Sequence, residues 1–96
     1  MREKNIENKL RREVGKRNGL CLKFLSPGFS GVPDRIILME GGKVGFVEVK
    51  SPGEKPRPLQ LSRHRLLRRL GFKVYVLDGI DEIQKIIEEV MPNEAS

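Results

Sequence analysis

The chain has 96 residues, of which 19 are Lys or Arg and 13 are Asp or Glu, for a formal net charge of +6. This length makes one small domain, residues 1 to 96, with a modest core. There is no run of about 18 apolar residues and no signal-peptide pattern, so we expect a cytoplasmic protein that does not span a membrane. The pI of about 9.8 favours a polyanionic partner. Nucleic acid suits it better than an anionic membrane, because no stretch combines a strongly apolar face with a lysine-rich one.

Residues 3 to 18 predict an amphipathic helix. Its apolar positions recur every four residues and are Ile6, Leu10 and Val14. Asn18-Gly19 follow it and tolerate the left-handed conformation that ends helices. Glu7 lies beside the apolar stripe, and from the residues alone it is a solvated acid that pairs with Arg11 one turn away.

Residues 20 to 25 predict a short strand, and residues 26 to 33 a loop rich in Gly and Pro. Cys21, the single cysteine, cannot form an internal disulfide and is expected to be a small buried apolar residue. Pro33 restricts the residue before it to an extended conformation. The loop therefore delivers the chain stiffly to Asp34.

Residues 34 to 39 and 44 to 50 predict two strands joined by a tight turn that contains Gly-Gly. Because side chains alternate between the faces of a strand, Glu48 and Lys50 point the same way. The turn brings the start of the first strand, at Asp34, near the end of the second. Two carboxylates and one ammonium then converge at one end of an apolar hairpin.

The register of this hairpin decides whether the charged groups share a face. A strict two-residue turn at Gly41-Gly42 would point Asp34 away from Glu48. A turn one residue longer, or a bulge, would pair Asp34 with Lys50 and Ile36 with Glu48, with the charged groups on one face. Burial does not choose between the registers, because the later positions of the first strand are all apolar. A shared site requires the second register.

Three prolines between residues 52 and 58 predict a loop, and helical spacing resumes over residues 59 to 70. The expected apolar stripe of this helix comprises Leu59, Leu66, Leu67 and Leu70. From residue 55 to residue 73 there are Lys and Arg residues but no acid, which predicts contact with a phosphate backbone. We expect these contacts from Lys55, Arg57, Arg65, Arg68 and Arg69. His64 is interpreted as a surface residue or a phosphate contact on this arginine-rich helix.

Residues 73 to 78 predict a fourth strand and residues 80 to 91 a last amphipathic helix, while residues 92 to 96 are expected to fray. The order α-β-β-β-α-β-α predicts an α/β fold with a mixed central sheet flanked by helices.

The hairpin end has the composition of a metal-dependent hydrolase site. Asp34 and Glu48 can hold Mg²⁺, which takes one or two carboxylates plus waters and substrate phosphate. The backbone carbonyl of Val49 would offer a further oxygen. Lys50 can polarise or deprotonate an attacking water and offset charge in the transition state. In so basic a chain, the pattern Pro-Asp…Glu-X-Lys predicts hydrolysis of phosphodiester bonds.

Three motifs carry a resemblance to a known family: Gly31-Val32-Pro33-Asp34, Phe46-Val47-Glu48-Val49-Lys50 and Pro58-Leu59-Gln60. They resemble VRR-NUC domains (virus-type replication-repair nucleases), a branch of the PD-(D/E)XK nuclease superfamily, and the similarity spans residues 3 to 90. It implies an αβββαβ restriction-endonuclease-like core followed by a C-terminal helix.

The resemblance also implies roles for individual residues. Asp34 and Glu48 would bind Mg²⁺ or Mn²⁺, and Lys50 would serve the attacking water. An acid on the first helix and a Gln opening the next helix correspond to Glu7 and Gln60. For Gln60, a plain helix-opening polar residue is an equal alternative.

Stand-alone members of this family resemble Holliday-junction resolvases, so the resemblance implies an endonuclease that resolves four-way DNA junctions as a homodimer. The dimer is also the physical expectation, because two matched cuts need two symmetry-related sites. Leu61 lies opposite the leucine stripe and is a candidate interface residue. A flap- or duplex-cleaving nuclease subunit and a DNA-binding module without catalysis are the alternatives.

Overall fold

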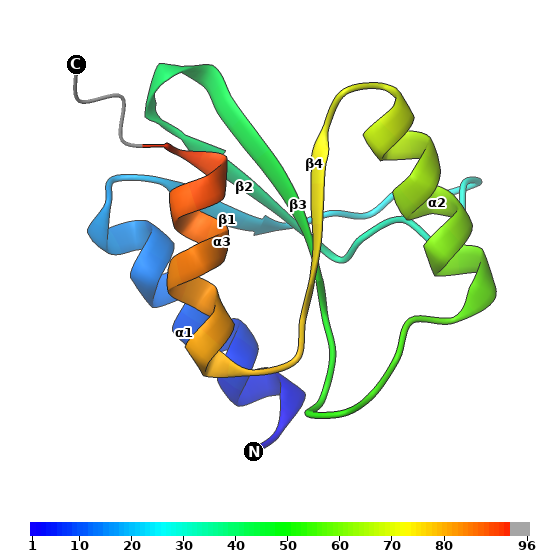
Figure 1. Ribbon diagram of the computed structural model, residues 1–96, viewed down its shortest axis with the longest axis horizontal. Coiled ribbons are helices and arrows are strands. Elements are labelled where there is room, and N and C mark those ends of the chain that lie inside the picture. The colour runs from blue at the N-terminus through cyan, green and yellow to red at the C-terminus, as the bar shows by residue number, and fades with distance from the viewer. Residues whose placement is uncertain (93–96) are drawn as a thin grey trace.

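The computed structural model describes residues 1 to 92 and has a four-stranded sheet with helices on both faces (Figure 1). In chain order its elements are α1 (Glu3–Lys16), β1 (Leu20–Lys23), β2 (Arg35–Met39), β3 (Lys43–Val49), α2 (Pro58–Arg69), β4 (Lys73–Leu77) and α3 (Ile83–Val90), with short 3₁₀ turns η1 (Glu40–Gly42) and η2 (Ile80–Glu82). This order confirms the predicted α/β fold. The expected frayed end lies outside the described residues, apart from Pro92. Each helix between residues 1 and 92 is too short or too polar to cross a bilayer.

The sheet is mixed, with strand order β1-β2-β3-β4. The first three strands form an antiparallel meander, whereas β4 runs parallel to β3 and is reached through α2. A parallel neighbour requires such a crossover, because a tight turn can only reverse the chain. The β2–β3 turn is tight because Gly41 and Gly42 adopt φ values of 80° and 75°, which favour glycine.

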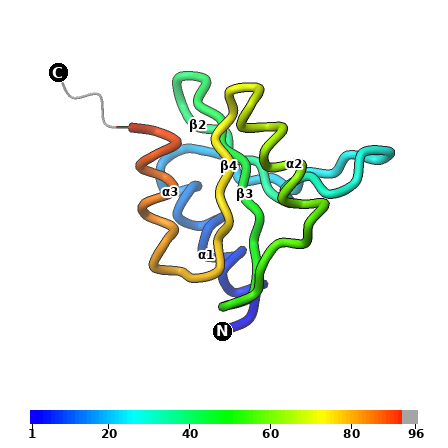
Figure 2. Tube along the Cα trace, turned by 45° about the vertical axis from the view of Figure 1, so that its right-hand side comes forward, coloured from blue at the N-terminus to red at the C-terminus, as the bar shows by residue number. Residues whose placement is uncertain are grey.

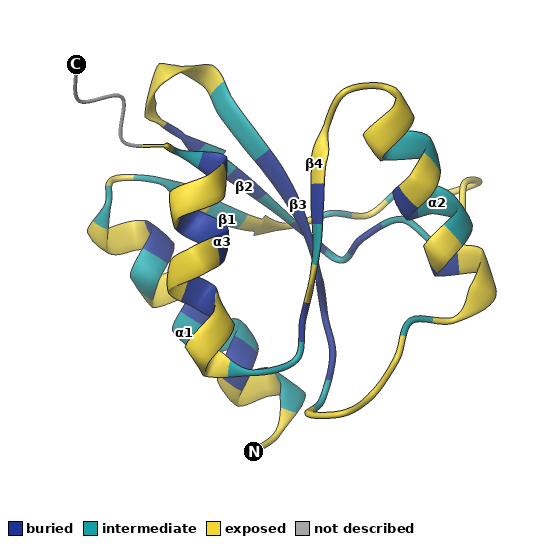
Figure 3. Ribbon diagram, in the orientation of Figure 1, coloured by how far each residue is buried: buried dark blue, intermediate teal, exposed yellow. Residues whose placement is uncertain are grey.

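One face of the sheet is covered by α1 and α3, as Figures 1 and 2 agree. The predicted stripe of α1, Ile6, Leu10 and Val14, is fully buried there. From α3 the buried residues are Ile83, Ile86, Ile87 and Val90, and Figure 3 shows buried and exposed stretches alternating along this helix. Cys21 packs against this core but is half-buried, rather than buried as predicted. The α1 helix ends two residues earlier than predicted, and Asn18 takes the expected left-handed conformation with φ of 62°.

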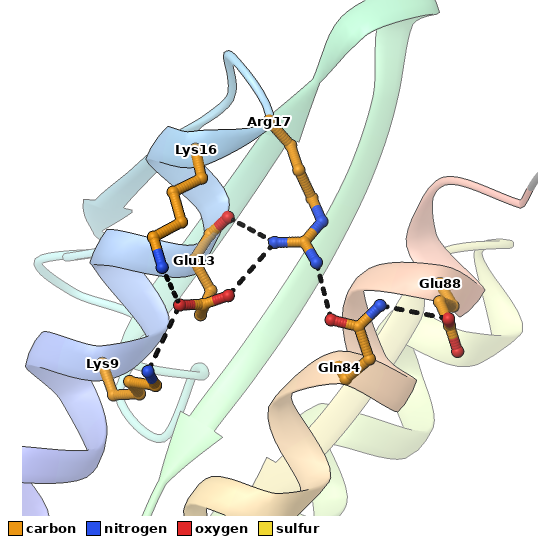
Figure 4. A network of polar contacts seen from close by, with 6 residues as sticks. All are labelled: Lys9, Glu13, Lys16, Arg17, Gln84 and Glu88. Atoms are coloured by element: carbon orange, nitrogen blue, oxygen red, sulfur yellow. Dashed lines mark hydrogen bonds and ion pairs between the residues drawn. The ribbon is translucent and has the colours of Figure 1, made fainter.

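The two helices on this face also contact each other through polar side chains (Figure 4). Glu13 accepts hydrogen bonds from Lys16 and Arg17 and forms an ion pair with Lys9. These contacts lower the pKa of Glu13 to about 2, and the hydrogen bond from Lys16 has the largest effect. Arg17 also donates to Gln84 of α3 at 2.6 Å. The network therefore links the C-terminal end of α1 to α3.

The other face of the sheet carries α2, and here the sequence prediction is wrong. Leu59 and Leu70 were expected in a buried stripe but are exposed, whereas the buried residues of α2 are Gln60 and His64. The reason is that α2 packs where β3 presents the polar side chain of Glu48. A polar partner on the sheet selects polar residues on the helix, since buried polar groups require hydrogen bonds.

Candidate active site

Asp34 ends the loop that leads into β2 and directly follows Pro33, which is fully buried. Its Oδ1 accepts a hydrogen bond of 3.0 Å from the backbone N–H of Val49 at the end of β3. Burial raises the pKa of the Asp34 carboxyl; the Val49 N–H lowers it, and the charge of Glu3 raises it further. This hydrogen bond holds the Asp34 carboxylate beside the end of β3 that carries Glu48.

Glu48 lies on β3 with 3 % of its surface exposed and faces α2. Its Oε2 accepts from Nε2 of Gln60 at 3.3 Å, and its Oε1 lies 3.3 Å from Nε2 of His64. Burial raises the pKa of Glu48 to about 7; the charge of Asp34 raises it as well, and Lys50 opposes both. The effect of Asp34 on Glu48 indicates that the two carboxylates lie close together.

Lys50 directly follows β3 and is 7 % exposed. Its backbone N–H donates to the carbonyl of Leu77 at 2.9 Å, which continues the pairing with β4. The positive charge of its side chain lowers the pKa of both Asp34 and Glu48. The structure therefore brings together the three groups that the sequence pattern singled out.

The hairpin register places these groups on one face, but the predicted pairs are wrong by two residues. Ile36 pairs with Phe46 rather than with Glu48, and the same register extended one residue beyond β2 would set Asp34 opposite Glu48 instead of Lys50. The turn is three residues long, η1, and closes one residue earlier along the chain than expected. A shift of two residues preserves the face that each side chain occupies. The functional inference from the register consequently survives the correction.

Glu7 of α1 forms an ion pair with the buried Arg35 of β2 rather than with Arg11. A cavity of about 240 Å³ next to Asp34 is lined by Glu7, Lys23, Leu25, Asp34 and Arg35. The charge of Glu3, one turn earlier on α1, raises the pKa of both Asp34 and Glu48. Two acids of α1 therefore border the site, and sequence reasoning singled out only Glu7.

Gln60 lies in the first turn of α2, as its motif predicted. Its Nε2 donates to Glu48, while its Oε1 accepts a 2.8 Å hydrogen bond from the backbone N–H of Arg57. Pro58 begins the helix, a position where the missing N–H costs nothing. The amide of Gln60 thus caps α2 and also contacts Glu48, while its role at the site stays a prediction.

His64 is not a surface residue, and the interpretation as a phosphate contact is wrong. It is fully buried, and its Nε2 is directed at Glu48. Burial lowers the pKa of His64, and the charges of Arg68 and Lys50 act in the same direction. His64 follows Gln60 by four residues, and that spacing was the available signal for a shared helical face.

The five residues expected to bind nucleic acid all lie on the exposed surface: Lys55, Arg57, Arg65, Arg68 and Arg69. The charge of Arg57 lowers the pKa of Glu48, which indicates that Arg57 lies near the carboxylates. Arg68 donates to the carbonyl of Val74 at 2.8 Å, so this side chain also contributes to the packing of α2 on β4.

Arg63 is a further cation that sequence reasoning passed over. Its guanidinium lies over the ring of Phe29, 3.9 Å from the ring centroid, and its Nε donates to the carbonyl of Ser30 at 2.7 Å. These contacts tie the loop between β1 and β2, which projects beside α2 in Figure 2, to the basic helix.

The family model described as "VRR-NUC domain" matches residues 2 to 81. A solved structure described as "VRR_NUC domain" superposes with a TM-score of 0.84 at 32 % identity, over 90 % of this chain and 94 % of its own. A protein of Acyrthosiphon pisum secondary endosymbiont phage 1, named "Putative nuclease p44", is 52 % identical over 81 residues, which are 84 % of this chain and 87 % of the phage protein. The fold and these three matches are those of a nuclease. The chain belongs to the VRR-NUC family.

Proposed function

We propose that this protein is a metal-dependent DNA endonuclease that resolves four-way junctions as a homodimer. One observation carries the catalytic part of the proposal: two carboxyl groups, Asp34 and Glu48, lie beside the buried Lys50, and burial raises the pKa of both acids. Such an arrangement is unfavourable in itself and marks functional sites. Cleavage of labelled DNA in Mg²⁺, and its loss in EDTA, tests this assignment.

The donor set fits a hard cation such as Mg²⁺ or Mn²⁺. Within residues 1 to 92, no group of three or more His, Cys, Asp or Glu side chains gathers to hold a metal. A site of this kind needs only one or two carboxylates, with waters and substrate phosphate completing the shell. Asp34, Glu48 and the carbonyl of Val49 would supply the protein oxygens. Bound there, the cation would supply Lewis-acid stabilisation of the phosphate.

The remaining roles belong to side chains around the carboxylates. The ammonium of Lys50 would orient the attacking water and stabilise negative charge as the phosphodiester bond breaks. Gln60 would fix Glu48 through its hydrogen bond. Glu7 would assist from α1, where its ion pair with Arg35 holds it at the cavity beside Asp34.

The basic helix is proposed to grip the phosphate backbone without reading bases. We expect Arg65→Gln with Arg69→Gln to weaken binding to all DNA sequences evenly and to lower the slope of log K against log salt by about 2, if each contacts one phosphate. The double substitution Arg11→Gln with Arg12→Gln removes the same charge from exposed positions of α1 and is the matched control. Equal losses of DNA affinity in both double variants would show that α2 contributes only through the net charge of the protein. A loss that depends on the DNA sequence would indicate base reading.

An uncharged surface supports the homodimer. On the α2 side of the sheet, the strands β1 to β3 leave an apolar sheet face made of Leu20, Leu22, Ile36, Leu38 and Val44, and Phe72, which precedes β4, borders it through its contact with Phe46. Leu20 and Leu22 are 57 % and 45 % exposed. Apolar patches of this kind mark contact surfaces in soluble proteins. DNA would gain little from a face without charge, whereas a second copy of a chain with net charge +6 approaches there with least repulsion.

Leu22→Glu is expected to convert the dimer to a monomer, because it buries two symmetry-related carboxylates in an apolar interface. Leu61→Glu is the comparison, since Leu61 is 40 % exposed on α2 and was the candidate from sequence. Light scattering at micromolar concentration measures the mass of each variant. A monomeric Leu61→Glu together with a dimeric Leu22→Glu would show that the interface lies on α2 instead. A monomeric wild type that still cuts junctions symmetrically would contradict the proposed dimer.

A further inference from the structure

The inward face of α2 is polar where an apolar face would be expected. Gln60 and His64 lie one turn apart, are 6 % and 0 % exposed, and both reach Glu48. His64 occupies a place that a leucine could fill. Its Nδ1 has no hydrogen-bond partner among residues 1 to 92, a loss that opposes folding. The residue therefore needs an explanation beyond packing.

The geometry around Glu48 supplies one. Gln60 contacts Oε2 and His64 contacts Oε1, each at 3.3 Å, so both oxygens of the carboxylate have a partner from a single helix. A carboxylate held at one oxygen can still turn about its terminal bond, whereas one held at both oxygens keeps its plane. Gln60 is itself fixed by the backbone N–H of Arg57. For His64 to donate to an ionised Glu48, its Nε2 must carry a hydrogen, and in the neutral imidazole Nδ1 is then unprotonated.

We propose that His64 is a positioning residue that fixes the Glu48 carboxylate, together with Gln60, in the orientation that binds the divalent cation. The inference rests on the proposed function, because it concerns the affinity of that same metal site. Groups that orient a metal ligand contribute about 10- to 100-fold to affinity. His64 would act through Glu48 and touch neither the cation nor the DNA.

Two substitutions of different reach test the proposal. In His64→Gln the amide nitrogen can take the place of Nε2, so Mn²⁺ affinity is expected to stay within about 3-fold of wild type, well inside the range of such orienting effects. In His64→Leu the volume is kept but no donor remains, so affinity is expected to fall by about 10- to 100-fold. Mn²⁺ binding is measured by electron paramagnetic resonance without DNA. The Mn²⁺ concentration for half-maximal cleavage should rise by the same factor.

A packing control separates positioning from structure. Leu66→Ala truncates a half-buried apolar residue of the same helix and is expected to lower the melting temperature without changing Mn²⁺ affinity. If His64→Leu does not fold, His64→Asn replaces it, because the shorter amide loses the reach of Gln. Wild-type Mn²⁺ affinity in His64→Leu, or in His64→Asn where that variant replaces it, would overturn the proposal and leave the nuclease assignment intact. A wild-type protein that neither binds Mn²⁺ nor cleaves would end the proposed function and this inference with it.

Discussion

Replacing Asp34 with Asn, or Lys50 with Met, is expected to reduce DNA cleavage by at least about 10²- to 10³-fold, the cost of removing one preorganised charge from an active site. Both substitutions keep the shape of the side chain and remove its charge. DNA binding is expected to remain within a few-fold of wild type, because Arg65 and Arg69 lie on a different element. Rates on labelled junctions and affinities from gel shifts measure the two effects separately.

Loss of folding does not explain the expected loss of cleavage. Asp34 is a half-buried carboxyl whose pKa is raised by burial, so its ionised form is not a source of stability. Asp81→Asn makes the same chemical change at an exposed position of η2 and should cleave as wild type does. Wild-type rates for Asp34→Asn or Lys50→Met would remove these residues from the catalytic site.

Raising the pH from 5 to 8 in the absence of metal is expected to destabilise the wild type relative to Glu48→Gln by about 2.5 kcal/mol. The pKa of Glu48 is about 7 in the folded protein, against 4.5 for its ordinary value. Between these values the folded chain holds a proton that the unfolded chain releases. Stability contributed by Glu48 is therefore present below pH 4.5 and is lost as the pH rises through 7.

His64 contributes in the opposite direction, which is why the comparison uses a variant. Burial lowers the pKa of His64, so the unfolded chain binds the proton more tightly and stability rises with pH towards 6.5. The wild-type curve alone would mix the two effects. Urea unfolding of wild type and Glu48→Gln at both pH values, in EDTA, isolates the Glu48 contribution. Parallel pH curves would show that Glu48 titrates normally.

Added Mn²⁺ should reverse this loss in the wild type at pH 8. A cation that binds the folded state alone stabilises it in proportion to the logarithm of its concentration. Glu48→Gln should gain less, because an amide offers one oxygen and no charge.

Much of the fold was predictable because its signals are local. The spacing of Ile6, Leu10 and Val14 predicted the buried side of α1, and Gly41-Gly42 predicted the hairpin. The register was not predictable, because Ile36 to Met39 are apolar on both faces of β2, and burial cannot distinguish registers along such a run. Alternation still placed Asp34 and Glu48 on one face, which is all that the site requires.

The sequence failed where polar residues are buried. The expected leucine stripe on α2 assumed an apolar sheet beneath the helix, but Glu48 lies there, so Gln60 and His64 are the buried residues. Arg35 was missed for a similar reason. Arg35 lies on the same face of β2 as Ile37, towards α1. Only the packing of this helix shows that Glu7 neutralises its charge there.

Cleavage of a labelled four-way junction, a flap and a linear duplex, side by side in Mg²⁺, Mn²⁺ and EDTA, tests the central claim most directly. We predict paired symmetric cuts in the junction with either metal, slower cutting of the flap and the duplex, and no cutting in EDTA. Equal rates on junction and duplex would keep the nuclease and discard the preference for junctions. Absence of cutting with both metals, or cutting that persists in EDTA, would contradict the assignment of Asp34, Glu48 and Lys50 as a metal-dependent active site.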